Sequence, residues 1–218
     1  NFKKLVILSM LTILYNNWHY ILLNMNNLIL IRHGQSIWNL KRRFTGWADV
    51  DLTDNGKSEA RYAGQLIKEM NIEFEAYFTS VQKRAINTLE IILDILNKKN
   101  LETKKAWELN ERHYGALTGL NKDEMIKKHG SKQVHIWRRS FDVVPPPMDL
   151  TNQHHPTKNK IYSDIPLDKI PDSESLKNTF ERVIPYYEIK IKPLILSKRN
   201  ILIAAHGNSL RALCKKIL

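Results

Sequence analysis

The sequence predicts an α/β fold, a three-layer sandwich in which a mostly parallel sheet lies between helices on both faces. Two observations support this fold class. Short apolar runs typical of buried strands alternate with longer segments of helical periodicity. Two of these runs, Leu28–Ile31 and Ile201–Ala205, lead into a His-Gly pair within two residues. Because parallel strands end at the same edge of a sheet, we expect His33 and His206 to lie close together there.

The elements of the first half follow from capping residues and side-chain spacing. Thr53 and Asp54 are N-cap candidates for a helix that reaches about Met70. A strand is expected over Ala76–Thr79. The apolar residues between Gln82 and Asn97 recur on one helical face. Lys104–Trp107 is a short strand candidate, so strand and helix alternate as a parallel sheet requires.

The middle of the chain predicts two helices and a long loop. Asn121 is expected to cap a helix that ends at His129, before Gly130. A second helix is expected over Gln133–Arg139. The segment 143–173 is rich in Pro, Asn, Asp and Lys and has no periodicity, which predicts a surface insertion.

Two further helices are expected near the carboxyl end. One runs from Ser175 to about Lys192, and Pro185 should kink it because proline has no backbone N–H. The other begins at Ser209, directly after the second His-Gly pair. No internal repeat and no second domain are evident in the sequence.

Composition limits the function classes. The formal net charge is +12, which is compatible with nucleic-acid binding, but the lysines are scattered and no basic stripe alternates with aromatic residues. A positive field also attracts a small polyanionic substrate. The single cysteine, Cys214, excludes an intramolecular disulfide and fits a reducing compartment, so a cytoplasmic location is expected.

Residues 1–24 are expected to lie outside the domain. Lys3 and Lys4 precede an apolar run that resembles the first two regions of a signal peptide. The run is short for a membrane span, polar residues interrupt it, and no small-residue cleavage site follows. We interpret the segment as an extension of the reading frame and place the domain at residues 25–218; a targeting segment is the alternative.

The first His-Gly pair has the residue types of a phosphoryl-transfer site. Gly34 allows a sharp turn and a close approach of the backbone to a ligand. Arg32 offers a planar cation that matches phosphate oxygens. A neutral His33 beside this cation can accept a phosphoryl group. The alternative is a strand end with a solvated arginine and a structural histidine, but the second pair at His206 and Gly207 favours a shared site.

Several longer motifs resemble those of the cofactor-dependent phosphoglycerate mutases, in the histidine phosphatase superfamily. The resemblance runs from about Leu28 to the last residue. Arg-His-Gly marks only the superfamily, whereas Asn-Glu-Arg-His-Tyr-Gly and Trp-Arg-Arg indicate the mutase branch. The matching stretches are Arg32–Ser36 with Trp38-Asn39, Arg43–Trp47, Thr79-Ser80 with Lys83–Ala85, Leu109–Gly115, Gly119–Lys122, Trp137–Arg139 and Ala205–Arg211.

The resemblance implies a reaction and its catalytic residues. The reaction would interconvert 3-phosphoglycerate and 2-phosphoglycerate through a phosphohistidine at His33, primed by 2,3-bisphosphoglycerate. Arg32, Arg84 and His206 would neutralise the transferred phosphoryl group. Glu111 would be the general acid and base. No metal is expected, because cations and amides supply the electrostatic stabilisation.

The resemblance also implies the groups that bind substrate. The substrate carboxylate and second phosphate need cations and hydrogen-bond donors. The alternative for each is an ordinary packed or solvated side chain. The implied binding residues are Ser36, Asn39, Thr45, Gly46, Arg112, Tyr114, Lys122, Arg138, Arg139, Gly207 and Asn208.

The chain departs from the family pattern in two respects. Gln35 stands where most relatives have Glu, and Ile37 where they have a polar residue. Similar mutases also continue beyond the equivalent of Leu218 with two strands and a tail that helps close the site. We therefore interpret the domain as truncated at its carboxyl end, expect Leu28–Ile31 to be an open sheet edge, and expect hydrolysis to increase or activity to be lost.

Three rival functions remain open at this point. A phosphatase of the same superfamily shares the Arg-His-Gly motif, but the Trp-Arg-Arg motif argues against it. An anion-binding protein without activity is the second rival, and a nucleic-acid-binding module is the third. We expect small phosphorylated substrates as partners, with no nucleic acid and no membrane, and a homo-oligomer, since relatives are commonly dimers or tetramers.

Overall fold

A five-stranded parallel sheet organises the chain, as seen in a computed structural model that describes residues 5–8, 26–98 and 101–218. The strand order is β1-β2-β5-β3-β4, and every pair is parallel. The predicted fold class is confirmed. The strands are β1 (Leu5–Leu8), β2 (Leu28–Arg32), β3 (Ala76–Thr79), β4 (Thr103–Lys105) and β5 (Ile201–Ala205).

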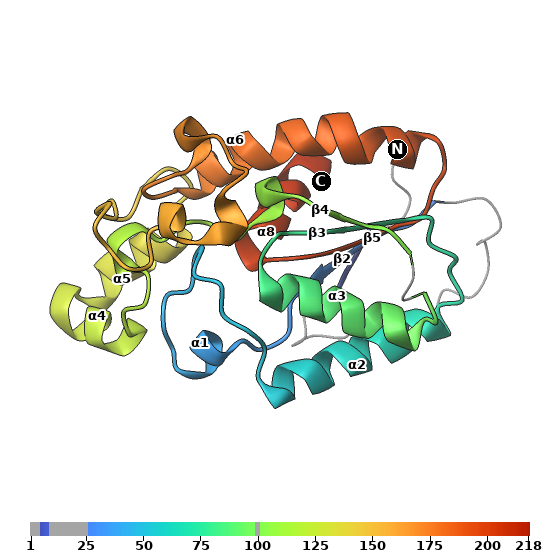
Figure 1. Cartoon of the computed structure of the whole chain (residues 1–218), viewed down its shortest axis with the longest axis horizontal. Coiled ribbons are helices and arrows are strands. Elements are labelled where there is room, and N and C mark those ends of the chain that lie inside the picture. The colour runs from blue at the N-terminus through green and yellow to red at the C-terminus, as the bar shows by residue number, and fades with distance from the viewer. Residues whose placement is uncertain (1–4, 9–25, 99–100) are drawn as a thin grey trace.

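Helices cover both faces of this sheet (Figure 1). Helices α2 (Asp54–Glu69) and α3 (Lys83–Ile95) pack on the face that Ile29 and Ile31 present. Helices α6 (Leu176–Tyr186) and α8 (Gly207–Ile217) pack on the face of Leu28 and Leu30. Successive strand residues point to opposite faces, so a strand buried on both sides needs an unbroken apolar run.

The remaining helices and turns lie mostly around the carboxyl edge of the sheet. Three of them, α1, α4 and α5, group at one side of the molecule (Figure 1). The remaining helices are α1 (Ile37–Leu40), α4 (Lys122–His129), α5 (Ser131–Arg139) and α7 (Lys192–Leu196). The remaining turns are the π-helical turn η6 (Tyr187–Ile191) and the 3-10 turns η1 (Trp107–Leu109), η2 (Gly115–Leu117), η3 (Pro156–Lys158), η4 (Lys160–Tyr162) and η5 (Leu167–Lys169).

The capping predictions are confirmed. The Thr53 side chain accepts a hydrogen bond from the Gly56 N–H and starts α2. Asn121 accepts from the Asp123 N–H and starts α4. Gly130 follows α4 with a φ of 81°, a backbone conformation that favours glycine. These signals act over three or four residues, which is why the sequence alone locates them.

Four predicted boundaries are wrong. Strand β4 starts and ends earlier than expected, and Trp107 opens the 3-10 turn η1. Helix α5 begins at Ser131 and α8 begins at Gly207. The helix expected to end near Lys192 continues to Leu196: Pro185 lies inside α6, and the wider turn η6 follows it. The Lys192 N–H donates to the Tyr187 carbonyl oxygen across this wider turn, so the chain stays helical into α7.

The segment 143–173 is more than a surface insertion. Tyr162 is 1% exposed and packs on Trp47 with the rings 4.9 Å apart between centroids. Its hydroxyl donates to the Trp47 carbonyl oxygen at 2.5 Å and accepts from Gln82 Nε2 at 3.0 Å. A single buried residue in an aperiodic loop has no spacing that could reveal it.

Strand β2 is not an open edge. The expectation of an exposed edge at Leu28–Ile31 is wrong, because β1 pairs with these four residues, with Leu5 opposite Leu28 and Leu8 opposite Ile31. Strand β1 belongs to the segment 1–24, whose other residues lie outside the described part of the chain. Within the described ranges, no helix has the length and apolar character needed to cross a membrane.

Candidate active site

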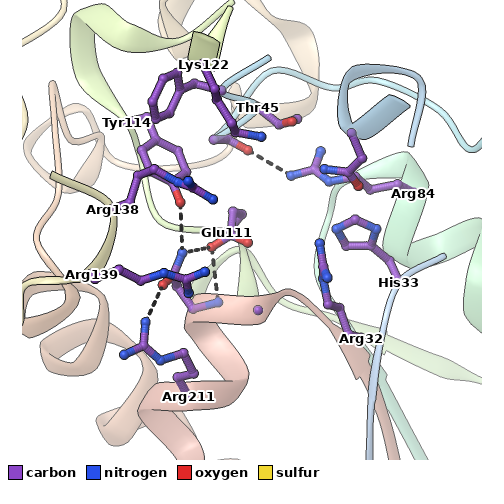
Figure 2. A pocket seen from close by; sticks show the side chains of 15 residues that line it. Arg32, His33, Thr45, Arg84, Glu111, Tyr114, Lys122, Arg138, Arg139 and Arg211 are labelled. Atoms are coloured by element: carbon purple, nitrogen blue, oxygen red, sulfur yellow. Dashed lines mark hydrogen bonds between the residues drawn. The ribbon is translucent and has the colours of Figure 1, made fainter. Parts of the chain in front are cut away.

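A cavity of about 260 Å³ opens at the carboxyl edge of the sheet, where β2 and β5 end (Figure 2). Most of its lining is polar or charged. The lining residues are Arg32, His33, Asn39, Phe44, Thr45, Gly46, Arg84, Glu111, Tyr114, Lys122, Arg138, Arg139, Gly207, Asn208 and Arg211. Thirteen of these fifteen are residues that the sequence predicted, and Phe44 and Arg211 are the exceptions.

The two predicted histidines meet at this edge. Arg32 lies opposite Ala205 in the sheet register, so His33 and His206 follow their strands side by side. Their ring centroids are 5.0 Å apart. His33 Nδ1 lies 2.7 Å from the Gly34 carbonyl oxygen and donates to it, which leaves the lone pair of the neutral ring on Nε2.

His206 is held from the opposite side. Its Nε2 is 2.7 Å from Ser80 Oγ, and this oxygen accepts from the Gln82 N–H. The Ser80 hydroxyl is therefore free to donate to Nε2, and Nδ1 then carries the ring hydrogen. Nδ1 is buried and has no hydrogen-bond partner among the described residues.

Both imidazoles are kept neutral. Burial lowers the pKa of His33 well below its usual value, and the charges of Arg84 and Arg32 lower it further. Burial, then the Arg84 charge and His33, lower the pKa of His206 well below its usual value. A neutral imidazole has the lone pair that a nucleophile needs.

Hydrogen-bond acceptors below the cavity hold the Arg84 guanidinium in one orientation. Its guanidinium donates to the carbonyl oxygens of Ala48 and Gly46, at 3.0 and 2.8 Å, and to Gln82 Oε1 at 3.0 Å. Gln82 is fully buried, and its Oε1 also accepts the Glu111 N–H at 3.2 Å. One amide thus links the arginine beside His33 to the backbone of the carboxylate.

The Glu111 carboxylate has two unlike oxygens. Oε1 accepts from the Arg112 N–H at 2.8 Å, from Asn208 Nδ2 at 2.7 Å and from the Asn208 N–H at 3.2 Å. No hydrogen bond to Oε2 occurs within the described part of the chain. Three donors fix the orientation of the group, and Oε2 is left to exchange a proton with a ligand.

Cations stand on two sides of this carboxylate. Figure 2 shows Arg32 and Arg84 beside His33, with Arg138, Arg139 and Arg211 across the cavity and Glu111 between the two groups. At the remaining side, Lys122 Nζ lies 5.8 Å from the centroid of the Phe44 ring. Burial, Arg138 and Arg42 lower the pKa of Lys122 to about 8. The arrangement suits a small ligand with an anionic group at each end.

Three predicted residues do not line the cavity. His206 is fully buried beneath it. Ser36 is the N-cap of α1, where it accepts from the Asn39 N–H. Arg112 is also fully buried: it donates to the carbonyl oxygens of Trp137 and Arg138 and stacks 4.7 Å from the Tyr114 ring centroid. It satisfies carbonyls that the end of α5 leaves free.

Sequence reasoning missed three residues at the site. Arg211 lies four residues after Gly207, one turn further along α8, and Nη1 is 3.4 Å from Asn208 Oδ1. That helical spacing was the available signal. Phe44 directly precedes the predicted Thr45. Gln82 had no signal, because a lone glutamine matches no chemical motif.

Some buried hydrogen-bond donors at the cavity have no acceptor among the described residues. Arg84 Nε and Thr45 Oγ1, which belong to residues lining the cavity, are buried and have no partner among the described residues. A buried donor without an acceptor costs about 1–3 kcal/mol, so an anionic ligand would stabilise this region. No group of three or more His, Cys, Asp or Glu residues with the spacing of a metal site occurs in the described ranges.

Comparisons with known proteins indicate one family for this chain. A family profile described as histidine phosphatase superfamily (branch 1) matches residues 28–155. A 2,3-bisphosphoglycerate-dependent phosphoglycerate mutase of Pelagibacter ubique is 56% identical over 191 residues, which cover 88% of this chain and 80% of the relative. The enzyme of the same name from Hydrogenobaculum is 53% identical over 193 residues, covering 88% and 78%.

Solved structures with low sequence identity share the fold. A phosphoglycerate mutase from Bacillus anthracis superposes with a TM-score of 0.61 at 21% identity, covering 87% of this chain and 78% of that one. A mycobacterial glucosyl-3-phosphoglycerate phosphatase gives 0.62 at 20% identity, covering 87% and 80%. Both mutases and phosphatases therefore use this architecture, and the fold alone does not separate them.

Proposed function

The chain belongs to the 2,3-bisphosphoglycerate-dependent phosphoglycerate mutases of the histidine phosphatase superfamily, branch 1, and we propose that it interconverts 3-phosphoglycerate and 2-phosphoglycerate through the residues of this cavity. The single observation that carries the site assignment is the placement of Glu111 between two groups of cations, with His33 in one of them. A substrate with two anionic ends would present its hydroxyl to the carboxylate.

The proposed transfer begins with the phosphoryl group on His33 Nε2. The substrate hydroxyl attacks phosphorus, the P–N bond breaks as the P–O bond forms, and Glu111 Oε2 takes the hydroxyl proton. The other phosphoryl group then moves to Nε2, and Glu111 returns the proton to the oxygen that this group leaves. The donors on Oε1 support this role, because they hold the carboxyl group in one orientation through both transfers.

The transferred phosphoryl group would be stabilised by donors fixed in advance. Arg84 and Arg32 would face its equatorial oxygens, with the His206 Nδ1 hydrogen as a neutral donor. Gly207 lines the cavity at the first turn of α8, where backbone N–H groups have no partner within the helix. The rigid bonds of Arg84 support this proposal, since such a donor needs no reorganisation during transfer.

At the far side, Arg138, Arg139 and Lys122 would bind the carboxylate and the phosphate that is not in transfer. Asn39, Thr45, Tyr114 and Asn208 would add hydrogen bonds. For Ser36 and Arg112 we propose indirect roles. Ser36 holds Asn39 in place through the α1 cap, and Arg112 orders the end of α5 that carries Arg138 and Arg139.

The residues present fit 2,3-bisphosphoglycerate as the primer. Buried donors without partners, such as Arg84 Nε and Thr45 Oγ1, surround a cavity with six cationic side chains and one carboxylate. When bound, the primer would supply the phosphoryl group that His33 carries between turnovers. His33 and Arg84 would hold one of its phosphates, and Arg138 and Lys122 the other. We propose that no metal takes part.

Three assignments about the whole protein are also proposals. We propose that the family's catalytic domain begins near Met25, which is supported by a family match that starts at residue 28, and that β1 is an added edge strand outside it. We propose that the protein is cytoplasmic, because its substrates would be small phosphorylated metabolites. We propose that the chain assembles as a homo-oligomer, as its resemblance to the family implies.

The test measures two products in one reaction. The chain is incubated with 3-phosphoglycerate, with and without 2,3-bisphosphoglycerate, and 2-phosphoglycerate and inorganic phosphate are followed together. We expect 2-phosphoglycerate formation that depends on the primer and a phosphohistidine, stable in base, that is absent from His33→Gln. Phosphate release without 2-phosphoglycerate would support a phosphatase instead. Neither product from a folded protein would favour an anion-binding role.

A further inference from the structure

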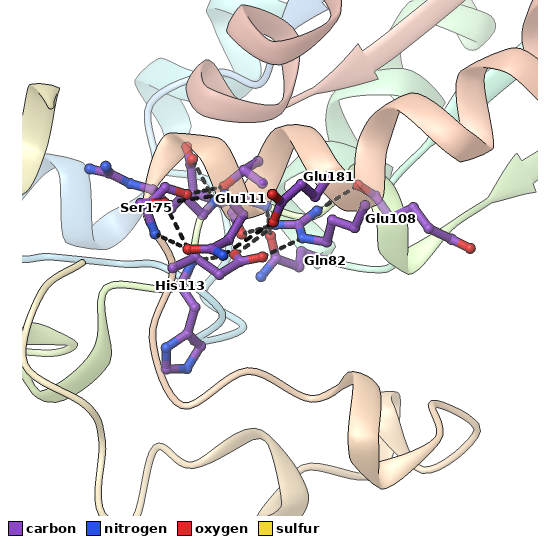
Figure 3. Close-up of polar contacts among 11 residues, drawn as sticks. Gln82, Glu108, Glu111, His113, Ser175 and Glu181 are labelled. Carbon is purple, nitrogen blue, oxygen red and sulfur yellow. Dashed lines mark hydrogen bonds and ion pairs between the residues drawn. The ribbon is translucent and has the colours of Figure 1, made fainter. Parts of the chain in front are cut away.

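A buried ion pair lies behind Glu111. Arg182 and Glu174 have side chains that are 9% and 4% exposed, and they form two hydrogen bonds, Nε to Oε1 at 2.6 Å and Nη2 to Oε2 at 2.9 Å. Glu174 directly precedes Ser175, the N-cap of α6, and Arg182 lies in the second half of that helix. Figure 3 shows the polar contacts of this region around Glu111, Glu108, His113 and Ser175. The mechanism proposed above does not use either residue.

The remaining donors of Arg182 hold the backbone of the catalytic segment. Nη2 donates to the Glu111 carbonyl oxygen at 3.0 Å, and Nη1 donates to the Glu108 carbonyl oxygen at 2.5 Å. The guanidinium also lies 5.6 Å from the Trp47 ring centroid. The planar fork of an arginine can bind several acceptors at fixed angles, which a lysine cannot do.

Glu174 holds the next part of the same segment. Its Oε2 accepts the His113 N–H at 2.8 Å, and its backbone N–H donates to the His113 carbonyl oxygen at 2.9 Å. The pair therefore fixes the peptide groups on both sides of Arg112. Segment 110–114 is neither helix nor strand, so it has no ladder of backbone bonds of its own.

We propose that Arg182 and Glu174 are positioning residues for Glu111, a role that rests on the proposed function of Glu111 as acid and base. The ion pair connects the Glu111 carbonyl group to helix α6 and so fixes the position of the Glu111 backbone. A proton must pass between Glu111 and an oxygen within hydrogen-bond reach in both transfers. A displacement of 1 Å at such a group can reduce a rate by about 100-fold.

The experiment compares two phosphoryl donors that differ in their leaving group, because only one of these leaving groups needs a proton from Glu111. This difference distinguishes a positioning role from a general contribution to stability. Transfer from 2,3-bisphosphoglycerate to His33 releases an alkoxide oxygen, which needs the Glu111 proton. Transfer from acetyl phosphate releases acetate, which leaves without protonation. We would measure the rate of His33 phosphorylation by each donor in a single turnover, in the full chain, for wild type, Glu111→Gln, Arg182→Lys and Glu174→Gln.

We expect Arg182→Lys to slow transfer from 2,3-bisphosphoglycerate by about 10- to 100-fold, with KM changed by about twofold or less. Transfer from acetyl phosphate should slow by about threefold or less. Glu174→Gln should give the same pattern to a smaller degree, because Gln retains an acceptor for the His113 N–H. It also carries the test if Arg182→Lys does not fold. The matched control is Lys192→Met, which removes a more exposed ion pair with Glu188 one helix further on and should leave both rates within about twofold.

Two results separate failure of this inference from failure of the proposed function. If Glu111→Gln slows both donors equally, Glu111 is not the acid and the proposed function fails with it. If Glu111→Gln is selective for 2,3-bisphosphoglycerate but Arg182→Lys and Glu174→Gln slow both donors equally or neither, the ion pair only stabilises the fold and the inference is overturned.

Discussion

The imidazole of His33 lies with its centroid 5.0 Å from that of His206, at an interplanar angle of 61°. The contact arises because β2 and β5 are parallel neighbours whose last residues, Arg32 and Ala205, stand opposite each other. Burial and the charges of Arg84 and Arg32 lower the pKa of His33, and burial, Arg84 and the neighbouring His33 ring lower that of His206. The sheet register thus maintains a neutral nucleophile at the cavity.

Replacement of His33 by Gln is expected to abolish phosphohistidine formation and to lower kcat by about 1,000-fold or more, because the neighbouring His206 is fully buried and its lone pair accepts from Ser80. The measurement is phosphoryl labelling quenched in base, where phosphohistidine is stable, alongside the mutase assay. His135→Gln, at an exposed position on α5, is the control and should retain full activity. Labelling of His33→Gln at the wild-type level would contradict the assignment.

The free energy of unfolding is expected to fall as the pH drops below about 6.5. Burial lowers the pKa of His113 to about 4, so between these values the unfolded chain binds a proton that the folded chain does not. His113 alone should account for about 1 kcal/mol between pH 7.5 and 5.5. Urea unfolding at both pH values measures it.

The variant His113→Asn isolates this contribution. His113 Nδ1 accepts the Gly115 N–H at 3.0 Å, and an Asn oxygen can replace that acceptor without titrating. The loss of stability on acidification should shrink by about 1 kcal/mol in this variant and stay the same in His135→Gln. An unchanged loss in His113→Asn would show that His113 does not titrate as described.

Substrate affinity is expected to decline as the pH rises through about 8. The pKa of Lys122 is lowered to about 8, first by burial and then by Arg138, so its amine loses its charge above that pH. KM for 3-phosphoglycerate should rise up to about 10-fold between pH 7.5 and 9, since one anion contact is lost. Lys122→Arg, which stays charged, should flatten this rise. An equal rise in both proteins would exclude Lys122 as the titrating contact.

Gly56→Ala is expected to destabilise the fold by about 2–3 kcal/mol and to reduce activity. A Cβ at Gly56 would lie 2.1 Å from the Gln35 carbonyl oxygen, and the loop after His33 would have to move. Thermal unfolding and kcat together measure the effect. Ser58→Ala, at an exposed position of the same helix, is the control and should change neither by much. Wild-type kcat in Gly56→Ala would mean that this packing does not reach His33.

The sequence predicted the parts of the site that depend on local pattern or on a recognisable motif. The strand ends at His33 and His206 could be predicted because an apolar run is visible and parallel strands share an edge. The roles of Gln82, Arg112 and Arg182 could not. Each depends on acceptors far away in the sequence, such as the Gly46, Arg138 and Glu111 carbonyls, which only the folded chain brings within reach.

The pairing at the edge of the sheet is a second feature that could not be predicted from the sequence. The segment containing Leu5–Leu8 has the apolar run of a strand, but its position next to Lys3 and Lys4 suggested an extension outside the domain. Its pairing with Leu28–Ile31 depends on an open edge elsewhere in the chain, which is a property of the topology. Local sequence carries no information about which edges a fold leaves to be filled.

The ratio of six cationic side chains to one carboxylate around the cavity has a consequence for the folded protein itself. Mutual repulsion among these cations opposes folding as long as no anion separates them. Any phosphorylated metabolite that binds only the folded chain shifts the folding equilibrium by RT ln(1 + [L]/Kd), about 2.7 kcal/mol at a hundredfold excess over Kd. The resistance of this protein to unfolding and proteolysis would then follow the metabolite supply of the cell, and starvation would shorten its lifetime before any regulator acted.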